Sequence, residues 1–276
     1  MRKVIAAGKE LIEKGEDFVI AKVVDTQGST PRKKGAWLLM QADGTKYGTV
    51  GGGILEANVE RECLNTFKTK ENKIYHYRLT AKEHGGIDMR CGGDADISIE
   101  YVNAKENPEA YIDEFDIKNT VYIFGAGHVA KAIAPILKYV DFGVVVLDDR
   151  ADYANVKRYP QVDGVKVLDS FDNCFDGLPM DENSYVIIVT RGHAKDYDVL
   201  IQALELPVEP AYIGMIGSKR KVAVSLKQLA ETGIPQEKID RVYSPIGMSI
   251  FAETPEEIAI SVVGEMIKVR SGHGDR

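Results

Sequence analysis

One cysteine of the sequence has neighbours that favour chemistry at its sulfur. Cys91 lies in the stretch "RCGG", with Arg90 before it and Gly92 and Gly93 after it. An arginine beside a thiol favours the thiolate, and the two glycines leave the sulfur open to attack or to a metal. We therefore interpret Cys91 as a functional thiol. The alternative is a small apolar residue that ends a loop before a strand.

A triplet of glycines, Gly51, Gly52 and Gly53, stands before a predicted helix in "VGGGILEANVE". Each glycine costs about 0.5–1 kcal/mol of extra conformational entropy relative to alanine, so such a run usually answers a steric demand. Backbone N–H groups in a segment of this kind can form a nest for anions. We expect a phosphate or a pterin-like ring to approach the backbone here. A tight turn between a strand and a helix is the alternative.

A further glycine cluster, in "VYIFGAGHVAKAIAPIL", has the pattern of a dinucleotide-binding turn. Gly125 permits a tight turn after a predicted strand, Gly127 lets a pyrophosphate reach the backbone, and Ala130 lets helix and strand pack closely. The next predicted strand ends in Asp148, 23 positions after Gly125. An acid there can bind a ribose hydroxyl. His128 in the turn would help to bind an anion or would face solvent, and a Rossmann fold without a dinucleotide is the alternative.

Two later segments place polar side chains directly after predicted strands. His193 follows "YVIIVT", and Ser218, Lys219 and Arg220 follow "AYIGMIG". Ligands bind outside the carboxyl ends of the strands in open α/β folds, and phosphates bind at helix N-termini. These four residues are therefore candidate ligand contacts. Helix starts that only face solvent are the alternative.

Two different patterns of elements must position these residues. Up to about residue 103 the sequence predicts an amphipathic helix, several short strands, a hairpin at Asp43 and Gly44, and a helix after the glycine triplet. From about residue 119, short apolar runs alternate with helical segments, as in a parallel sheet covered on both faces. We therefore predict an α/β chain, with a small mixed α+β domain at 1–103, a charged linker at 104–118 and a Rossmann-like, doubly wound parallel-sheet domain at 119–276.

The composition is ordinary for a globular protein, with 276 residues and a formal net charge of -7. The negative charge argues against nucleic acid as the main partner. No apolar run approaches the roughly 20 residues needed to cross a bilayer, and the N-terminal helix is amphipathic, so we expect no membrane segment or signal peptide. The cytoplasm is therefore expected, with free thiols. Of the two other cysteines, Cys63 is predicted in a core and Cys174 in a loop.

Several motifs together resemble the XdhC/CoxI family, whose members are accessory proteins of xanthine dehydrogenase and related molybdenum hydroxylases. The motifs are "GSTPRKKGA", "GTVGGGILE" and "RCGG" in the first region, and "YIFGAGHVA", "YIGMIGSKRK" and "ETPEEIAISV" in the second. They cover almost the whole chain in the family's own order. The resemblance implies a small N-terminal domain, a Rossmann-like C-terminal domain and a homodimer.

The resemblance also implies a molybdenum cofactor chaperone more than a turnover enzyme. Such a protein binds the molybdopterin cofactor, promotes exchange of an oxo for a sulfido ligand with a cysteine desulfurase as sulfur source, and passes the cofactor to the apo-hydroxylase. We expect Cys91 to contact molybdenum or to carry sulfur, because thiolate is a soft ligand. The other residues of "RCGG", the glycine triplet and the loop with Ser29 and Arg32 would line the same pocket. Arg32 would bind the phosphate bidentately, or would be only an exposed loop charge.

Two other functions stay open. An NAD(P)-dependent oxidoreductase would use the dinucleotide-binding turn, with His193 as proton donor. A nucleotide-sensing regulatory protein would bind a nucleotide such as NAD(P) in the Rossmann-like domain and a partner through the first domain, and would leave Cys91 without a chemical role. One stretch departs from the family, because Ser249 and Phe251 stand where the family commonly has Asp and Gly. An acidic group is thus lost from a loop beside the Rossmann-like site.

Overall fold

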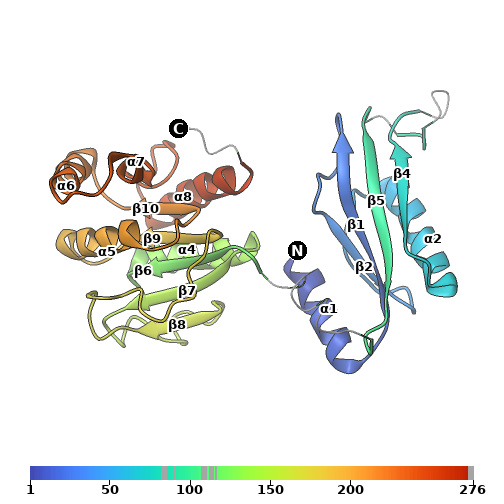
Figure 1. The fold of residues 1–276 in the computed structure, drawn as a ribbon, viewed down its shortest axis with the longest axis horizontal. Helices are drawn as coiled ribbons and strands as arrows, with labels where there is room; N and C mark the ends of the chain where they lie inside the picture. The colour runs from blue at the N-terminus through green and yellow to red at the C-terminus, as the bar shows by residue number, and fades with distance from the viewer. Residues whose placement is uncertain (82–85, 90, 107–110, 112–114, 116, 273–276) are drawn as a thin grey trace. The chain divides into compact units, whose positions relative to one another are not determined.

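The computed structural model describes residues 1–81, 86–89, 91–106, 111, 115 and 117–272. The chain divides into two compact units, Met1–Asp116 and Ile117–Arg276 (Figure 1). The first unit holds an antiparallel sheet and the second a parallel sheet. The predicted fold class, a small mixed α+β region followed by a Rossmann-like region, is confirmed.

The first unit is built on a five-stranded antiparallel sheet with the strand order β3-β2-β1-β5-β4. Its strands are β1 Phe18–Gln27, β2 Trp37–Gln41, β3 Lys46–Gly48, β4 Lys73–Arg78 and β5 Asp94–Val102, and its helices are α1 Arg2–Lys14 and α2 Gly53–Thr69. Helix α1 packs against β2 and β3, whereas α2 packs against β1 and β5. The predicted hairpin joins β2 to β3, and the Asp43 carboxylate accepts the Thr45 N–H at 2.8 Å in its turn.

Strand β1 forms the centre of this unit's core. Successive side chains of a strand point to opposite faces, so each face of β1 packs against its own apolar layer. Val19 and Ala21 belong to the core that also holds Cys63 of α2. The ring of Phe18 lies against Phe115, with 5.9 Å between the ring centroids. Burying a valine or phenylalanine side chain stabilises the fold by about 1.5–3 kcal/mol. The packing on both faces therefore holds β1 in place, and with it the loop that follows this strand.

The second unit is built on a six-stranded parallel sheet with the strand order β11-β10-β9-β6-β7-β8. Its strands are β6 Thr120–Phe124, β7 Gly143–Asp148, β8 Gly164–Val167, β9 Ser184–Ile188, β10 Tyr212–Met215 and β11 Val242–Tyr243. Its helices are α4 His128–Tyr139, α5 His193–Glu205, α6 Lys219–Glu231, α7 Gln236–Asp240 and α8 Pro255–Arg270. Counted along the chain from β6, the strand order is that of the Rossmann fold, and the order reverses between β6 and β9.

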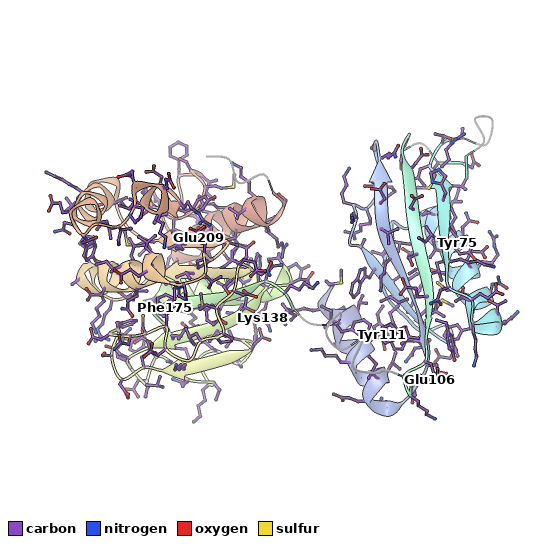
Figure 2. The ribbon with its side chains drawn as sticks, viewed as in Figure 1. Tyr75, Glu106, Tyr111, Lys138, Phe175 and Glu209 are labelled. Carbon is purple, nitrogen blue, oxygen red and sulfur yellow. The ribbon has the colours of Figure 1, made fainter. Side chains whose placement is uncertain are left out.

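Both faces of the parallel sheet are covered, as its continuous apolar runs predict. Ile133 of α4 and Val262 of α8 belong to the core on one face. Val199 of α5 belongs to a separate core on the other face. Phe175, labelled in Figure 2, joins this second core with its ring centroid 4.6 Å from that of Phe124. The sheet is therefore doubly wound, and only its edges and strand ends are open.

Helix α8 begins with the capping box that the sequence predicts. Thr254 Oγ1 accepts the Glu257 N–H at 3.2 Å, and the Glu257 carboxylate accepts the Thr254 N–H at 3.0 Å. Pro255 occupies the first turn, where its missing N–H costs nothing. Across the parts of the chain that the structure describes, no helix has both the length and the apolar character needed to span a membrane.

Candidate functional site

Three glycine-containing loops meet in the first unit. They are the loop that begins at Gly28, the glycine triplet before α2, and the "CGG" segment before β5. A side-chain carbon added to Gly28 would lie 3.2 Å from the Cα atom of Gly93. One added to Gly51 would lie 3.2 Å from the Cβ atom of Pro31. The structure therefore brings together the three motifs of the first unit that the sequence singled out.

Gly93 is where this arrangement tolerates no side chain. A carbon added there would lie 2.4 Å from the carbonyl oxygens of both Gln27 and Ser29. The adjoining backbone is held by Leu79, whose N–H donates to Gly93 O at 2.8 Å and whose carbonyl accepts the Gly92 N–H at 2.9 Å. The close approach thus fixes the start of the Ser29 loop against the segment that carries the cysteine.

The glycine triplet adopts a backbone conformation that other residues avoid. Gly51, Gly52 and Gly53 have φ angles of 148°, 72° and 58°. The carboxylate of Glu56 accepts the Gly52 N–H at 3.1 Å and the hydroxyl of Thr49. Burial raises the pKa of Glu56, but these hydrogen bonds outweigh it and hold the pKa below its usual value. The predicted anion nest therefore holds the chain's own carboxylate, which an external anion would have to displace.

Cys91 is the one partly exposed thiol of the chain. All three cysteines are free, and Cys63 and Cys174 are buried. Burial raises the pKa of each of these two thiols to about 12, so both stay protonated at neutral pH. Cys91 packs at the border of the core beneath α2. The prediction that Cys63 is a core residue is confirmed.

The remaining predicted residues around the thiol lie in different surroundings. Ser29 and Arg32 are exposed in their loop. Arg90 lies outside the described residues. Within the described ranges, no group of three or more histidine, cysteine, aspartate or glutamate side chains gathers as a metal site.

The dinucleotide-type turn of the second unit is fixed between the ends of its neighbouring strands. Gly125 has a φ angle of 106°, and a side-chain carbon there would lie 2.3 Å from the carbonyl oxygen of Val189. Its N–H donates to Leu147 O at 2.7 Å. Gly127, just before α4, has no atom within 4 Å of the position of an added side-chain carbon. The turn is thus closed at Gly125 and open at Gly127, as a phosphate-binding turn requires.

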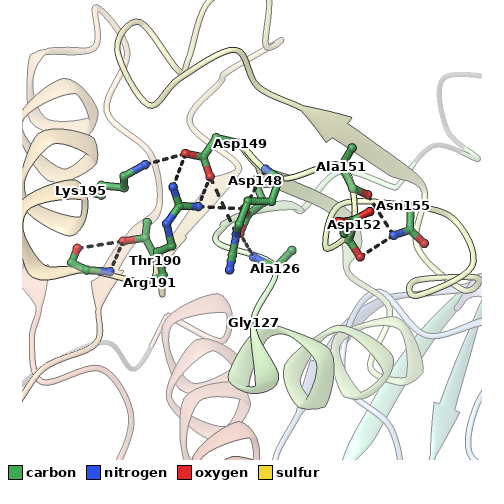
Figure 3. A network of polar contacts seen from close by, with 12 residues as sticks. Ala126, Gly127, Asp148, Asp149, Ala151, Asp152, Asn155, Thr190, Arg191 and Lys195 are labelled. Atoms are coloured by element: carbon green, nitrogen blue, oxygen red, sulfur yellow. Dashed lines mark hydrogen bonds and ion pairs between the residues drawn. The ribbon is translucent and has the colours of Figure 1, made fainter.

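A network of charges lies beside this turn (Figure 3). Asp148 is only 1% exposed and accepts the Ala126 N–H at 2.7 Å. Its carboxylate also pairs with Arg150, at 2.8 Å from Nε and 2.9 Å from Nη2. The next residue, Asp149, pairs with Arg191 and with Lys195, whose Nζ lies 2.5 Å away. Burial raises the pKa of Asp149, but the two cations outweigh it and hold that pKa far below its usual value.

The other predicted residues of the second unit stand at helix starts near the carboxyl ends of the strands. His128 is exposed in the first turn of α4. The Nε2 atom of His193 lies 3.2 Å from the Ser225 hydroxyl, so this imidazole contacts α6. Ser218 is exposed just before α6. Lys219 and Arg220 begin that helix, and their side chains lie outside what the structure describes.

Sequence reasoning missed the charged residues of the network other than Asp148. Arg150 and Lys195 did not enter the predicted site, and Asp149 was passed over in favour of its neighbour. A usable signal existed, because acidic and basic residues cluster within a few positions after β7 and after β9. Strands β7 and β9 lie on either side of β6 in the parallel sheet, so all three end at the same edge and the residues that follow β7 and β9 converge there.

Both units match a known protein family. Residues 121–266 match the XdhC Rossmann domain, and residues 11–78 match the XdhC and CoxI family. A solved structure of a xanthine dehydrogenase from Bacillus halodurans superposes with a TM-score of 0.77 and 24% sequence identity, covering 96% of each chain. This likeness supports the two-part fold.

Three relatives resemble the chain over nearly its whole length. The "Uncharacterized protein YqeB" of Escherichia coli (strain K12) is 32% identical over 95% of this chain, which spans only 45% of YqeB. A probable xanthine dehydrogenase component from Bacillus subtilis (strain 168) is 22% identical over 94% of this chain and 95% of the relative. The "Molybdenum cofactor insertion chaperone PaoD" of Escherichia coli (strain K12) is 22% identical over 98% of this chain and 88% of PaoD.

Proposed function

Because the chain belongs to the XdhC and CoxI family, we propose that it is an accessory protein that carries molybdenum cofactor to a xanthine dehydrogenase-type hydroxylase. In this proposal it binds the cofactor as cargo, supports its sulfuration and delivers it to the apoenzyme. The similarity to PaoD, a molybdenum cofactor insertion chaperone, supports the carrier role. The observation that carries the proposal is the meeting of three glycine loops beside the one partly exposed thiol.

The chemistry of the cargo fits these residues. Molybdopterin is a large anion with a phosphate tail and a dithiolene-bound metal, so its carrier needs close backbone approach and one soft ligand. The glycine loops supply the approach, and Cys91 supplies a thiol that binds molybdenum or carries sulfur. Arg32 and Ser29, exposed on the adjoining loop, would contact the phosphate. Glu56 would leave the Gly52 amide when that phosphate enters.

Two partners follow from this role. The molybdenum hydroxylase apoenzyme would receive the cofactor, and a cysteine desulfurase would supply the sulfur that Cys91 accepts or passes on. We place this exchange in the cytoplasm, where the three free thiols would stay reduced. The protein then acts as a carrier of a reactive group more than as a turnover enzyme.

We propose that an exposed apolar surface on the second unit forms the interface with a second copy of the chain. Ile260 and Ile267 stand exposed on α8, with Gly264 between them, and Phe251 is 94% exposed on the preceding loop. Helix α8 is acidic in its first turn and basic in its last turn. Two copies of α8 packed antiparallel would pair acidic with basic ends. Light scattering should show a dimer that Ile260→Glu converts to monomers, and an unchanged mass would remove this interface.

The cargo proposal is tested by loading the purified protein anaerobically with molybdenum cofactor and measuring retained molybdenum and pterin. Wild type should retain both stoichiometrically, and Cys91→Ala should lose them. Cys63→Ala is the matched control, because it removes a buried thiol of the same unit and should leave retention unchanged. Retention by Cys91→Ala equal to that of wild type would reject the role of the thiol. No retention by wild type would favour the regulatory or oxidoreductase function of the Rossmann unit.

A further inference from the structure

The carboxylate at the end of β7 has no free lone pair for a ligand. A carboxylate offers about four lone-pair sites. Asp148 accepts four N–H groups, from the Ala126 amide at 2.7 Å, the Arg150 amide at 3.1 Å, Arg150 Nε at 2.8 Å and Arg150 Nη2 at 2.9 Å. The position where an acid would hold a ribose diol is therefore saturated by the chain itself.

The groups that face outward from this network are cations. The side chains of Arg150, Arg191 and Lys195 are 28%, 41% and 33% exposed, whereas those of Asp148 and Asp149 are 1% and 11% exposed. Three positive charges stand against two negative charges in these ion pairs. Asp152, two positions after Arg150, is also exposed. The edge thus presents the cations of the ion pairs outward and keeps their carboxylates inside.

Aromatic packing fixes the orientation of Arg150 and of the neighbouring Arg158. The guanidinium of Arg150 lies 3.7 Å from the centroid of the Tyr153 ring, and that of Arg158 lies 5.0 Å from the same centroid. Arg158 also donates to the carbonyl of Ala126 in the glycine turn at 3.3 Å. A guanidinium held in place can present the N–H groups that do not bond Asp148 to phosphate oxygens with little entropy left to lose.

From these contacts we propose that the edge formed by Arg150, Arg191 and Lys195 binds a phosphate monoester and discriminates against ligands that offer only a ribose diol. In Rossmann folds an acid at this position selects the diol, whereas an arginine accommodates a 2′-phosphate. The phosphate has two possible sources, the 2′-phosphate of a dinucleotide or the phosphate of the pterin cargo. With the first source the inference goes beyond the proposed carrier role. With the second it rests on that role, and the edge would replace Ser29 and Arg32 as the contact of the cargo phosphate.

Calorimetric titration of the 276-residue chain with NADPH and with NADH tests the first source. NADPH should bind at least tenfold more tightly than NADH. Added salt should weaken the binding of NADPH more than the binding of NADH. Arg150→Ala should abolish the difference, because it removes a cation from the edge and frees Asp148 for the diol. Lys195→Met is a second variant that leaves Asp148 paired and should lower the preference severalfold. Arg241→Gln, before β11 and paired with Glu209, is the control.

The second source is tested with the same variants by measuring retained cofactor. If neither dinucleotide binds but Arg150→Ala and Lys195→Met lose pterin, the edge binds the cargo phosphate. The proposal is overturned if NADH binds as tightly as NADPH. It is also overturned if neither variant changes the affinity for a dinucleotide or the amount of retained cofactor. These outcomes are separable from the thiol test, because Cys91→Ala lies in the other unit and should leave NADPH binding unchanged.

Discussion

Glu56 provides a sharp test of how the first unit holds its glycine triplet. Its carboxylate accepts the Gly52 N–H and the Thr49 hydroxyl and lies in the first turn of α2. Glu56→Ala removes both hydrogen bonds, which hold the glycine triplet against the start of α2. We expect the loop to loosen and the unit to lose stability.

The magnitude follows from the contacts. A hydrogen bond to a charged group contributes about 1.5–3 kcal/mol, and an acidic residue in the first turn of a helix adds about 0.3–1 kcal/mol. Because Glu56 is only half-buried, water recovers part of the loss. The expected decrease in the free energy of unfolding for Glu56→Ala is therefore about 2–3 kcal/mol. Glu56→Gln keeps an acceptor oxygen and should lose only about 1 kcal/mol.

The pH dependence has a definite sign. The pKa of Glu56 is lower in the folded chain than its value of about 4.3 in an unfolded chain. Its stabilising effect is therefore complete above pH 4.3 and is lost as the pH falls through the folded-state pKa. The difference between wild type and either variant should shrink between pH 5 and pH 3.

Urea unfolding followed by tryptophan fluorescence isolates this unit. The chain has a single tryptophan, Trp37, which lies in β2 and packs edge-on against Phe115. Glu71→Gln, at an exposed residue that forms a surface ion pair with Lys73, is the control and should change the midpoint little. A Glu56→Ala midpoint within error of wild type at pH 7, or the same deficit at pH 7 and pH 3.5, would refute the reasoning.

Three further predictions concern packing, thiols and capping. Gly93→Ala should destabilise the first unit by about 1–3 kcal/mol in the same urea assay, because its side chain would meet two carbonyl oxygens at 2.4 Å; a neutral result would contradict the close approach. A thiol reagent at pH 8 should modify one cysteine, Cys91, in the native protein and all three in urea, because burial raises the pKa of the other two to about 12. Because the pKa of these two thiols is raised in the folded chain, the free energy of unfolding should fall above about pH 9. Labelling of more than one thiol in the native protein would count against this packing. Thr254→Ala should reduce the free energy of unfolding of the second unit by about 1 kcal/mol and so lower its calorimetric unfolding midpoint. Equal midpoints for wild type and Thr254→Ala would show that the capping box does not stabilise this unit.

Local patterns in the sequence were sufficient for the elements and much of their arrangement. Apolar periodicity, the turn at Asp43 and Gly44, and the cap at Thr254 act between residues close in the chain, so they can be recognised without a structure. The dinucleotide-type turn was predicted in the same way, because Gly125 and Gly127 belong to one strand–turn–helix unit. The single half-exposed thiol, Cys91, was also distinguished by its immediate neighbours.

The tertiary structure decided which groups are free to act. The need for glycine at position 93 arises from carbonyl groups at the end of β1, and the need at position 125 arises from the end of β9. The sequence placed Asp148 correctly but could not show that four N–H groups saturate it. Likewise, it predicted an anion nest without showing that the Gly52 amide of this nest already donates to Glu56. Hydrogen-bond saturation and close approach depend on distances between segments, and those distances exist only once the strands have paired.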